Sequence, residues 1–245
     1  MKTAFITGCN RGLGLTLLKS FASEGYYIIA HSRKYSEEWD KQCREMESDF
    51  HIEIKNVYFN LSCKEEVIKG LQDINDLDIE IDVLINNAGV NNVVKPLMYL
   101  EYEDIEDTFM INYFSPVIIM KEVASTMVRQ GQGCIINISS MMADGHQPCG
   151  TCYDASKAAL NQCTKSVAQE LAPFNIRVNG IACGVMNSGM SANLNEKAHA
   201  KLIKAVAFKR PAETEEIAKV ALFLASESAS YITGEIVNVN GGAII

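Results

Sequence analysis

The chain has 245 residues, of which 48% are hydrophobic, 21% charged and 8% aromatic, with 16 Gly and 5 Pro. This composition is that of an ordinary globular protein and excludes disordered, collagen-like and low-complexity architectures. The formal net charge of −8 and the pI of about 5.1 repel a polyanion, so we do not expect nucleic acid as a partner.

The chain shows no Pro/Ser-rich linker, internal repeat or composition break, so we predict a single domain over residues 1–245. No apolar run approaches the roughly 20 residues that cross a bilayer, and the apolar part of the N-terminus is too short for a signal peptide. We therefore expect a cytoplasmic protein without a membrane partner. The eight scattered cysteines should then be free thiols.

The chain opens with a pattern typical of a strand, a turn and a helix. A short strand is predicted over Thr3–Thr7, and after a glycine-bearing turn apolar residues recur at three- and four-residue spacing from Leu13 to Phe21. Gly25 ends this helix, Tyr26–Ala30 is predicted as a second buried strand, and a polar helix is predicted from Ser36 to Ser48.

Strands and helical segments then alternate to the end of the chain. Five further strands are predicted, at Ile52–Phe59, Asp82–Asn86, Gly133–Ile138, Ile176–Ile181 and Glu235–Val239. Because nearly all strand residues are apolar, helices must cover both faces of the sheet. The sequence predicts an α/β fold: a Rossmann-type doubly wound parallel sheet of about seven strands.

One irregular stretch, from Cys183 to about Glu196, follows the carboxyl end of a predicted strand. Ligands bind at that edge of open α/β sheets, so the stretch is a candidate substrate loop or lid. An ordinary surface loop is the alternative.

The turn after the first strand has glycines in the spacing G-x-x-x-G-x-G. Glycines there permit a tight turn and the close approach of a dinucleotide, whose pyrophosphate would face the positive end of the helix. An ordinary glycine turn is the alternative, but the position between a strand and an amphipathic helix favours nucleotide binding. The candidate residues are Gly8, Asn10, Arg11, Gly12, Leu13 and Gly14.

The end of the second strand indicates which dinucleotide binds. An acid there would bind the adenosine ribose and repel a 2′-phosphate, but the sequence is His31-Ser32-Arg33-Lys34. With Arg11, these cations favour NADP(H) over NAD(H). A solvated basic corner is the alternative.

Tyr153 and Lys157 are spaced to lie on one face of a helix that begins near Tyr153. Of the nine tyrosines, only this one has a lysine four residues later. A nearby cation favours the phenolate, so we expect Lys157 to lower the pKa of Tyr153 and make it a usable general acid or base.

Five motifs in order resemble the short-chain dehydrogenase/reductase family, over nearly the whole chain. They are T-G-x-x-x-G-x-G at Thr7–Gly14, Asn86–Gly89, Asn112 within a helix, Ser139-Ser140 after the fifth strand, and Tyr153-x-x-x-Lys157. The resemblance implies a seven-stranded parallel sheet and an NAD(P)-dependent oxidoreductase that acts on CH–OH groups.

By this resemblance the catalytic residues are Asn112, Ser140, Tyr153 and Lys157. Tyr153 would protonate a carbonyl oxygen that Ser140 also binds, Lys157 would hold the nicotinamide ribose, and Asn112 would anchor a water that resupplies the proton. Taken singly, Ser140 could be a turn residue, Asn112 a residue that distorts its helix, and Lys157 a surface charge. The implied cofactor-binding residues, with no metal, are Gly8, Asn10, Arg11, Gly12, Leu13, Gly14, Ser32, Arg33, Asn60, Leu61, Asn87, Ala88, Gly89, Tyr153, Lys157, Gly184, Val185 and Ser188.

The sequence departs from the family pattern at three positions. Cys183 stands where Pro is usual, which frees the backbone before the lid. Ser188 replaces a Thr but keeps a hydroxyl for the carboxamide, and Asn60 replaces an Asp at the adenine-contacting position but can still hydrogen-bond.

Cys149 and Cys152 form a C-x-x-C motif directly before Tyr153. A single pair lacks the four ligands of structural zinc. We expect an inert, packed pair; a redox-sensitive gate on the active site is the alternative.

Met141, Met142, Met186, Met190 and Leu194 fall on the segments expected to flank the substrate carbonyl, where thioethers suit an apolar pocket, although simple packing would equally explain them. The ending Gly234–Gly242 looks most like those of 3-oxoacyl-(acyl-carrier-protein) reductases. Arg129 fits one of the basic residues on which such enzymes dock their acidic carrier, but Pro173 and Phe174 occupy the region of another.

We therefore predict an NADPH-dependent reductase of a 3-oxoacyl thioester or similar ketone. The alternative is an NAD(P)-dependent dehydrogenase of a sugar, polyol or other secondary alcohol, which would use the same catalytic residues. A nucleotide-sensing or scaffold protein without turnover is disfavoured because Tyr153 and Lys157 are both present.

The segment Phe114–Met120 and the helix from Tyr153 are apolar over more than one face. Apolar surface of that extent is usually buried against a partner. Because the family commonly forms tetramers through these helices, we expect a homotetramer or homodimer. Burial in the core of one chain is the alternative.

Overall fold

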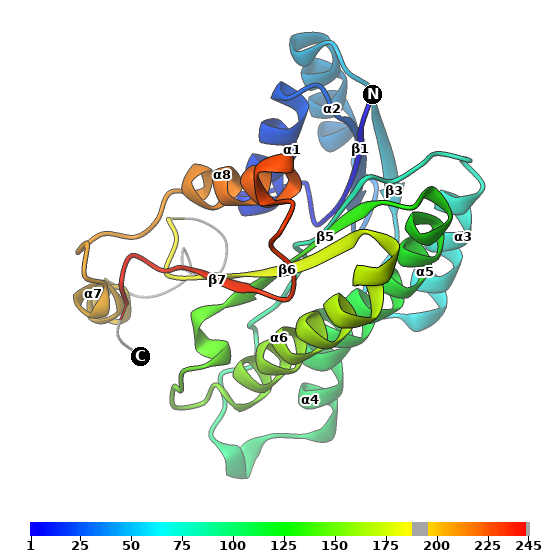
Figure 1. The fold of residues 1–245 in the computed structure, drawn as a ribbon. Helices are drawn as coiled ribbons and strands as arrows, with labels where there is room; N and C mark the ends of the chain where they lie inside the picture. The colour runs from blue at the N-terminus through cyan, green and yellow to red at the C-terminus, as the bar shows by residue number, and fades with distance from the viewer. Residues whose placement is uncertain (188–195, 244–245) are drawn as a thin grey trace.

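The computed structural model describes residues 1–187 and 196–243, built on one seven-stranded sheet in the order β3-β2-β1-β4-β5-β6-β7 (Figure 1). Every neighbouring pair of strands is parallel. The predicted doubly wound parallel α/β sheet is confirmed. Its strands are β1 (Thr3–Thr7), β2 (Tyr27–Ser32), β3 (Ile54–Tyr58), β4 (Val83–Asn86), β5 (Gly133–Ser140), β6 (Ile176–Cys183) and β7 (Ile236–Val239).

Helices cover both faces of the sheet, with α1, α2 and α8 on one face and α3, α5 and α6 on the other (Figure 1). No helix in the described ranges is long and apolar enough to span a bilayer. The helices are α1 (Gly12–Ser23), α2 (Glu37–Phe50), α3 (Lys64–Asn75), α4 (Tyr102–Phe109), α5 (Ser115–Gln130), α6 (Thr151–Leu171), α7 (Glu196–Ala205) and α8 (Thr214–Ala225). Short helical turns are η1 (Leu97–Tyr99), η2 (Met110–Phe114, a π-helical turn), η3 (Met141–Ala143), η4 (Ala172–Phe174) and η6 (Glu227–Ala229).

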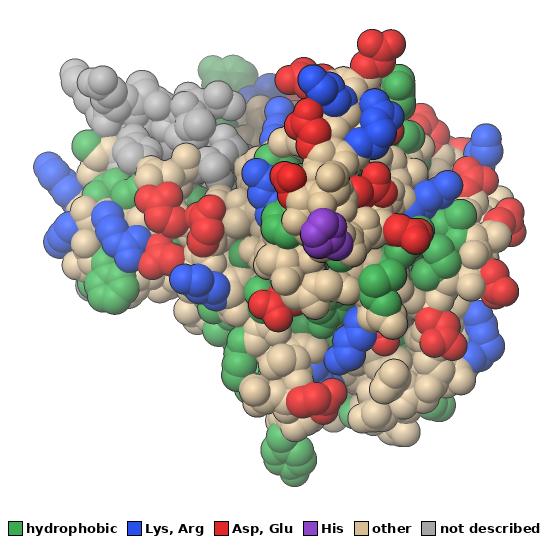
Figure 2. Space-filling view, turned by 90° about the horizontal axis from the view of Figure 1, so that it is seen from above, with side chains coloured by type: hydrophobic (Ala, Val, Ile, Leu, Met, Phe, Trp, Pro, Cys, Tyr) green, Lys and Arg blue, Asp and Glu red, His purple; other side chains and the backbone are tan. Residues whose placement is uncertain are grey.

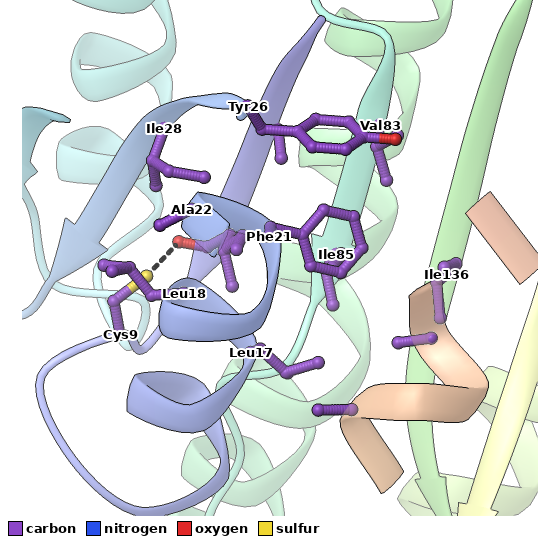
Figure 3. Close-up of a cluster of buried hydrophobic side chains, with 14 of the residues drawn as sticks. Cys9, Leu17, Leu18, Phe21, Ala22, Tyr26, Ile28, Val83, Ile85 and Ile136 are labelled. Carbon is purple, nitrogen blue, oxygen red and sulfur yellow. Dashed lines mark hydrogen bonds between the residues drawn. The ribbon is translucent and has the colours of Figure 1, made fainter. Parts of the chain in front are cut away.

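Two hydrophobic layers, one on each side of the sheet, hold these helices in place. Because successive strand residues point to opposite faces, Ala4 and Ile6 of β1 pack on the α1 side, whereas Phe5 packs on the α5 side. Figure 3 shows the α1 layer, where the rings of Phe21 and Tyr26 meet edge to face at 5.0 Å between centroids. All five residues of β1 are buried, as predicted for a strand covered on both faces.

Three strands extend beyond their predicted carboxyl ends. β2 begins at Tyr27 and continues to Ser32 instead of spanning Tyr26–Ala30, and β5 and β6 each continue two residues further than predicted, to Ser140 and Cys183. The prediction stopped β2 and β5 just before the polar residues that end with Ser32 and Ser140. Both serines are nevertheless buried and pair in parallel register with the neighbouring strand.

β1 has the predicted bounds, and the remaining strands differ from theirs by one or two residues. β3 is shorter than the predicted Ile52–Phe59, and β4 and β7 each begin one residue later than predicted. The polar helix predicted from Ser36 to Ser48 is α2, and Ser36 caps it by accepting a hydrogen bond of 3.1 Å from the backbone N–H of Trp39. Helix α6 begins at Thr151, so Tyr153 lies within its first turn.

Much of the segment Phe114–Met120 is buried within one chain. Ser115, Pro116, Ile119 and Met120 all lie on the buried side of α5. Core burial therefore accounts for most of its apolar character, while Phe114 remains 46% exposed.

Strand order reverses between β1 and β4, which lie side by side at the centre of the sheet. From β1 the chain continues to β2 and β3 toward one edge of the sheet. From β3 it crosses back to β4, on the other side of β1, and continues toward the opposite edge. Such a switch point opens a crevice at the carboxyl edge, the usual place for a ligand in this architecture.

Candidate functional site

The glycine turn connects β1 to α1 at this crevice. Gly8 and Gly12 have φ angles of +72° and +54°, in the left-handed region that favours glycine. A Cβ on Gly14 would lie 1.9 Å from the carbonyl oxygen of Gly8, so only glycine fits there. Asn10 and Arg11 are exposed in the turn, whereas the side chain of Leu13 is buried in the core, which leaves only its backbone to face a ligand.

The N-terminus of α1 suits an anion. Arg11 occupies the capping position without a side-chain hydrogen bond to the helix, and the first turn contains no acidic residue. The free N–H groups and the positive end of the helix dipole therefore have no built-in negative partner. With the close glycine packing, this arrangement fits the pyrophosphate of a dinucleotide.

The segment after β4 is locked onto the glycine turn. The hydroxyl of Thr7 accepts hydrogen bonds of 3.0 Å from the backbone N–H groups of both Asn87 and Ala88. The side-chain amide of Asn87 in turn donates to the carbonyl oxygens of Thr7 and Gly8, at 2.8 and 3.2 Å. The two segments predicted to hold the cofactor are thus adjacent and rigidly connected.

A basic corner lies beyond the end of β2. Arg11, Arg33 and Lys34 are exposed, and within the described ranges no carboxylate lies within ion-pair distance of any of them. Ser32 is buried, with its hydroxyl donating to the carbonyl oxygen of Lys34 at 3.1 Å.

Asn60 follows β3 and caps the next turn. Its side-chain oxygen accepts a hydrogen bond of 3.1 Å from the N–H of Ser62, and its own N–H donates to Glu66 at 2.8 Å. This leaves the amide NH₂ of Asn60 as its free donor. Leu61 is buried in the hydrophobic layer on the α3 and α5 side.

Ser140, Tyr153 and Lys157 converge at the carboxyl end of β5. Ser140 is the last residue of that strand, and its hydroxyl lies close enough to the Tyr153 phenol to lower the pKa of that group. Lys157 is buried, and its ammonium donates to the carbonyl oxygen of Ile138 at 2.8 Å. The alternative of a surface lysine is therefore wrong, whereas Ser140 does also cap the next turn, η3, by accepting a hydrogen bond of 3.2 Å from the N–H of Met142.

The pKa of Tyr153 differs from the expectation. Burial raises it to about 12, and the nearby Ser140 side chain offsets only part of this rise. Burial also lowers the pKa of Lys157 to about 8. The expected lowering of the tyrosine pKa is wrong for the chain alone, because removal from water opposes both charged forms and the lysine directs its charge at a backbone carbonyl.

Asn112 lies in the π-helical turn between α4 and α5, with its side chain fully buried. It accepts a hydrogen bond of 2.8 Å from the N–H of Val90 and donates to the carbonyl oxygen of Val90 and to the hydroxyl of Ser156, at 2.9 and 3.0 Å. Ser156 donates to the carbonyl oxygen of Tyr153 at 2.7 Å. Asn112 is thus connected to the helix turn that carries the phenol.

Gly89 lies between Asn112 and Lys157. A Cβ added there would be 3.3 Å from both the Asn112 side-chain oxygen and the Lys157 ammonium nitrogen. No role is predicted from the sequence for Ser156, because a serine inside a helix gives no sign of its partner.

An apolar wall lies against Tyr153. Met141, Met142 and Val185 are buried and form one cluster with the tyrosine. Met186 instead packs against the core layer on the α1 side, in agreement with the alternative of simple packing. Gly184 lies against Asn240, with 2.6 Å between an added Cβ and the Cα of Asn240. Ser188, Met190 and Leu194, and with them most of the candidate lid, lie outside the described residues.

The C-x-x-C motif straddles the start of α6. Cys149 is half-buried with a φ of +65°, and Cys152 is buried within the first turn of the helix. Burial raises the pKa of the Cys152 thiol, which disfavours the reactive thiolate. All eight cysteines are free thiols, and within the described ranges no three His, Cys, Asp or Glu side chains cluster as a metal site.

Known proteins resemble this chain over almost its full length. A family model described as enoyl-(acyl carrier protein) reductase matches residues 8–243. The 3-oxoacyl-(acyl-carrier-protein) reductase FabG of Aquifex aeolicus is 34% identical, covering 98% of this chain and 96% of that protein. The 3alpha-hydroxysteroid dehydrogenase of Mediterraneibacter gnavus is 36% identical, covering 99% and 96%.

Solved structures agree with this fold. A protein from Agrobacterium tumefaciens described as a gluconate dehydrogenase superposes with a TM-score of 0.92 at 28% identity, covering 98% of this chain and 95% of that one. A protein from Beutenbergia cavernae described as an NAD(P)-dependent gluconate 5-dehydrogenase, solved with bound NADP, also gives 0.92, at 26% identity and coverages of 98% and 96%. The matched family model and these full-length relatives show that the chain belongs to the short-chain dehydrogenase/reductase family, oxidoreductases that act on CH–OH and carbonyl groups.

Proposed function

We propose that the protein is an NADPH-dependent carbonyl reductase in which Tyr153 is the proton donor. The observation that carries this proposal is the convergence of Ser140 and Tyr153 at the carboxyl end of β5, with Lys157 buried one helical turn away. At neutral pH a phenol with a raised pKa keeps its proton, which is the form that a reductase needs.

Each residue has a distinct part in the reaction. Tyr153 donates its proton to the carbonyl oxygen, and Ser140 donates a hydrogen bond to the same oxygen and stabilises the negative charge that develops on it. Lys157 holds the ribose of the nicotinamide and supplies positive charge beside the phenol. Asn112 anchors a water from which the proton is resupplied, with Ser156 fixing its orientation toward Tyr153.

The cofactor part of the proposal rests on the glycine turn and the basic corner. The glycine turn and the α1 N-terminus hold the pyrophosphate, with Asn87, Ala88 and Gly89 beside it. Asn60 and Leu61 border the adenine, and Arg33 with Arg11 binds the 2′-phosphate, because neither cation is neutralised within the described ranges. Gly184, Val185 and Ser188 border the nicotinamide, which when bound supplies the hydride.

The substrate we propose is a 3-oxoacyl thioester or a similar ketone with an apolar chain. The Met141, Met142 and Val185 wall beside Tyr153 supports an apolar substrate, and the Aquifex aeolicus relative is named for this reaction. Figure 2 shows acidic and basic side chains interspersed over one face, and the described part of that face has no broad basic field to attract an acidic carrier protein.

The alternative is a dehydrogenase of a sugar, polyol or other secondary alcohol. It is favoured by the hydroxysteroid dehydrogenase relative, at 36% identity, and by the gluconate dehydrogenase structures. It uses the same four catalytic residues and differs in direction and substrate.

The proposal extends to the whole molecule. We propose that residues 1–245 form one nucleotide-binding domain, that the protein acts in the cytoplasm, and that chains associate as a homotetramer or homodimer.

The direct test measures NADPH consumption by the purified protein with acetoacetyl thioesters, ketones, steroids and sugars. Turnover of thioesters or apolar ketones is expected, and turnover of sugars or polyols alone would favour the alternative. Tyr153→Phe removes the proton donor and lowers kcat by about 10²- to 10⁴-fold. Unchanged turnover in this variant would overturn the proposal.

The cofactor preference has its own test. Arg33→Ala is expected to weaken NADPH binding by roughly tenfold to a hundredfold, the effect of one charge-assisted hydrogen bond, and to leave NADH binding unchanged. Equal losses for both cofactors would contradict the assignment of the 2′-phosphate to Arg33.

A further inference from the structure

His31, near the carboxyl end of β2, has both ring nitrogens bonded to backbone groups of its neighbours. Nδ1 lies 3.2 Å from the N–H of Gly8 in the glycine turn, and Nε2 lies 2.9 Å from the carbonyl oxygen of Phe59 at the end of β3. The residue is only 2% exposed. Its register partners are Thr7 on β1 and Val57 on β3, so it sits between the two segments that it bonds.

These two bonds fix the tautomer of the ring. A backbone N–H can only donate, so Nδ1 must accept from Gly8, and a carbonyl oxygen can only accept, so Nε2 must carry the hydrogen. Burial lowers the pKa of His31 to about 4, which keeps the ring neutral at physiological pH. Protonation would turn Nδ1 into a donor facing another donor.

The bonded groups belong to the turn and strand end that flank the adenosine part of the proposed site. The backbone oxygen of His31 also accepts from the N–H of Cys9 at 2.9 Å, and the ring packs on that of Phe59 with 4.2 Å between centroids. On its other side the Gly8 peptide is held by Asn87. His31 therefore fixes the spacing between the glycine turn and the Phe59–Asn60 segment.

We propose that His31 is a positioning residue for the adenosine half of the dinucleotide, holding the glycine turn and the Asn60 segment at the spacing that the bound cofactor requires. This inference rests on the proposed function. It concerns cofactor binding and not the proton or hydride transfer, because within the described residues His31 bonds to the turn and strand end and not to Ser140, Tyr153 or Lys157.

Three variants distinguish the effect of losing the His31 hydrogen bonds from the effect of losing core packing. His31→Leu fills similar space but removes both bonds. His31→Asn places an oxygen near the position of Nδ1 and keeps an acceptor for Gly8. Ile29→Val, two residues earlier in β2 and fully buried on the same face of the sheet, serves as a control for loss of core packing alone.

Titration of each protein with NADPH and with adenosine 2′,5′-bisphosphate gives the dissociation constants. His31→Leu is expected to weaken both by roughly tenfold to a hundredfold, with kcat at saturating NADPH close to wild type. His31→Asn should recover part of the affinity, and Ile29→Val should bind like wild type. Wild-type affinity in His31→Leu, or an equal loss in Ile29→Val, would overturn the inference.

A measurement on the unmodified protein covers the case in which His31→Leu does not fold. Nitrogen NMR of the histidine rings should show His31 as a neutral ring with the hydrogen on Nε2, and a ring protonated on Nδ1 would overturn the inference. If the wild-type chain binds neither NADPH nor NADH, the proposed function itself fails, whereas normal wild-type binding with an unaffected His31→Leu variant removes only the role of His31.

Discussion

Tyr153 and Lys157 show what residue spacing reveals and what it omits. Their four-residue spacing predicted a shared helix face, and both side chains are buried beside the carboxyl end of β5. Residue spacing does not show whether folding removes a side chain from water. Burial therefore reversed the expected direction of the tyrosine pKa and lowered the pKa of the lysine to about 8.

The lysine pKa leads to a prediction about pH. Lys157 is charged below pH 8 and loses its proton as the pH rises through about 8, whereas Tyr153, with a pKa of about 12, stays protonated over this range. The rate of carbonyl reduction should therefore hold near neutral pH and fall above about pH 8. The measurement is kcat against pH at saturating NADPH.

Lys157→Arg is the control, because a guanidinium stays charged throughout this range. Whatever turnover the variant retains should show no decline near pH 8. A decline that persists in the variant would assign it to another group.

Among the secondary structure elements, the sequence predicted every strand of the described sheet but not where several strands end. Hydrophobic periodicity located the strands because their buried residues are apolar. It stopped short at His31-Ser32 and Ser139-Ser140, where buried polar residues continue the strand. Hydrophobicity cannot distinguish such buried polar residues from the start of a loop.

The π-helical turn η2 was also beyond sequence analysis. Asn112 was predicted within a helix, and the structure places it in a turn where Val90 and Ser156 satisfy its amide. These partners lie far apart in sequence, so only the fold brings them together.

The first turn of α1 gives the second prediction. Gly14→Ala would place a methyl group 1.9 Å from the carbonyl oxygen of Gly8 and 2.7 Å from the Asn87 amide nitrogen, and neither group can move without disturbing the turn. We expect loss of NADPH binding by at least tenfold and a lower Tm. Calorimetric titration and thermal unfolding measure both effects.

Lys19→Ala, at an exposed position of the same helix, is the matched control and should change neither quantity. Normal NADPH affinity in Gly14→Ala would show that the tight contact between α1 and the turn is not needed for binding.

At the scale of the whole molecule, strand order brings distant motifs together. The alternation of strands and helices predicted a parallel sheet, but it cannot by itself place β4 next to β1. That adjacency brings Thr7 and Asn87, 80 residues apart, into hydrogen-bond contact. The order of the family motifs supplied the evidence for a common site, and the three-dimensional contacts supply the distances.

Association of chains gives the last prediction. Tyr102 and Ile105 of α4 and Phe114 of η2 are 69%, 41% and 46% exposed, so these two consecutive elements, called here the α4–η2 strip, keep exposed apolar side chains in the single chain. If chains associate through it, a carboxylate at Phe114 would be buried without a partner and would oppose assembly. Light scattering should give a multiple of 27.0 kDa for the wild type and a smaller species for Phe114→Asp.

Ile68→Asp on α3, where the side chain is 41% exposed, is the control that should leave the mass unchanged. A wild-type monomer, or an unaltered oligomer in Phe114→Asp, would exclude this strip as the contact between chains.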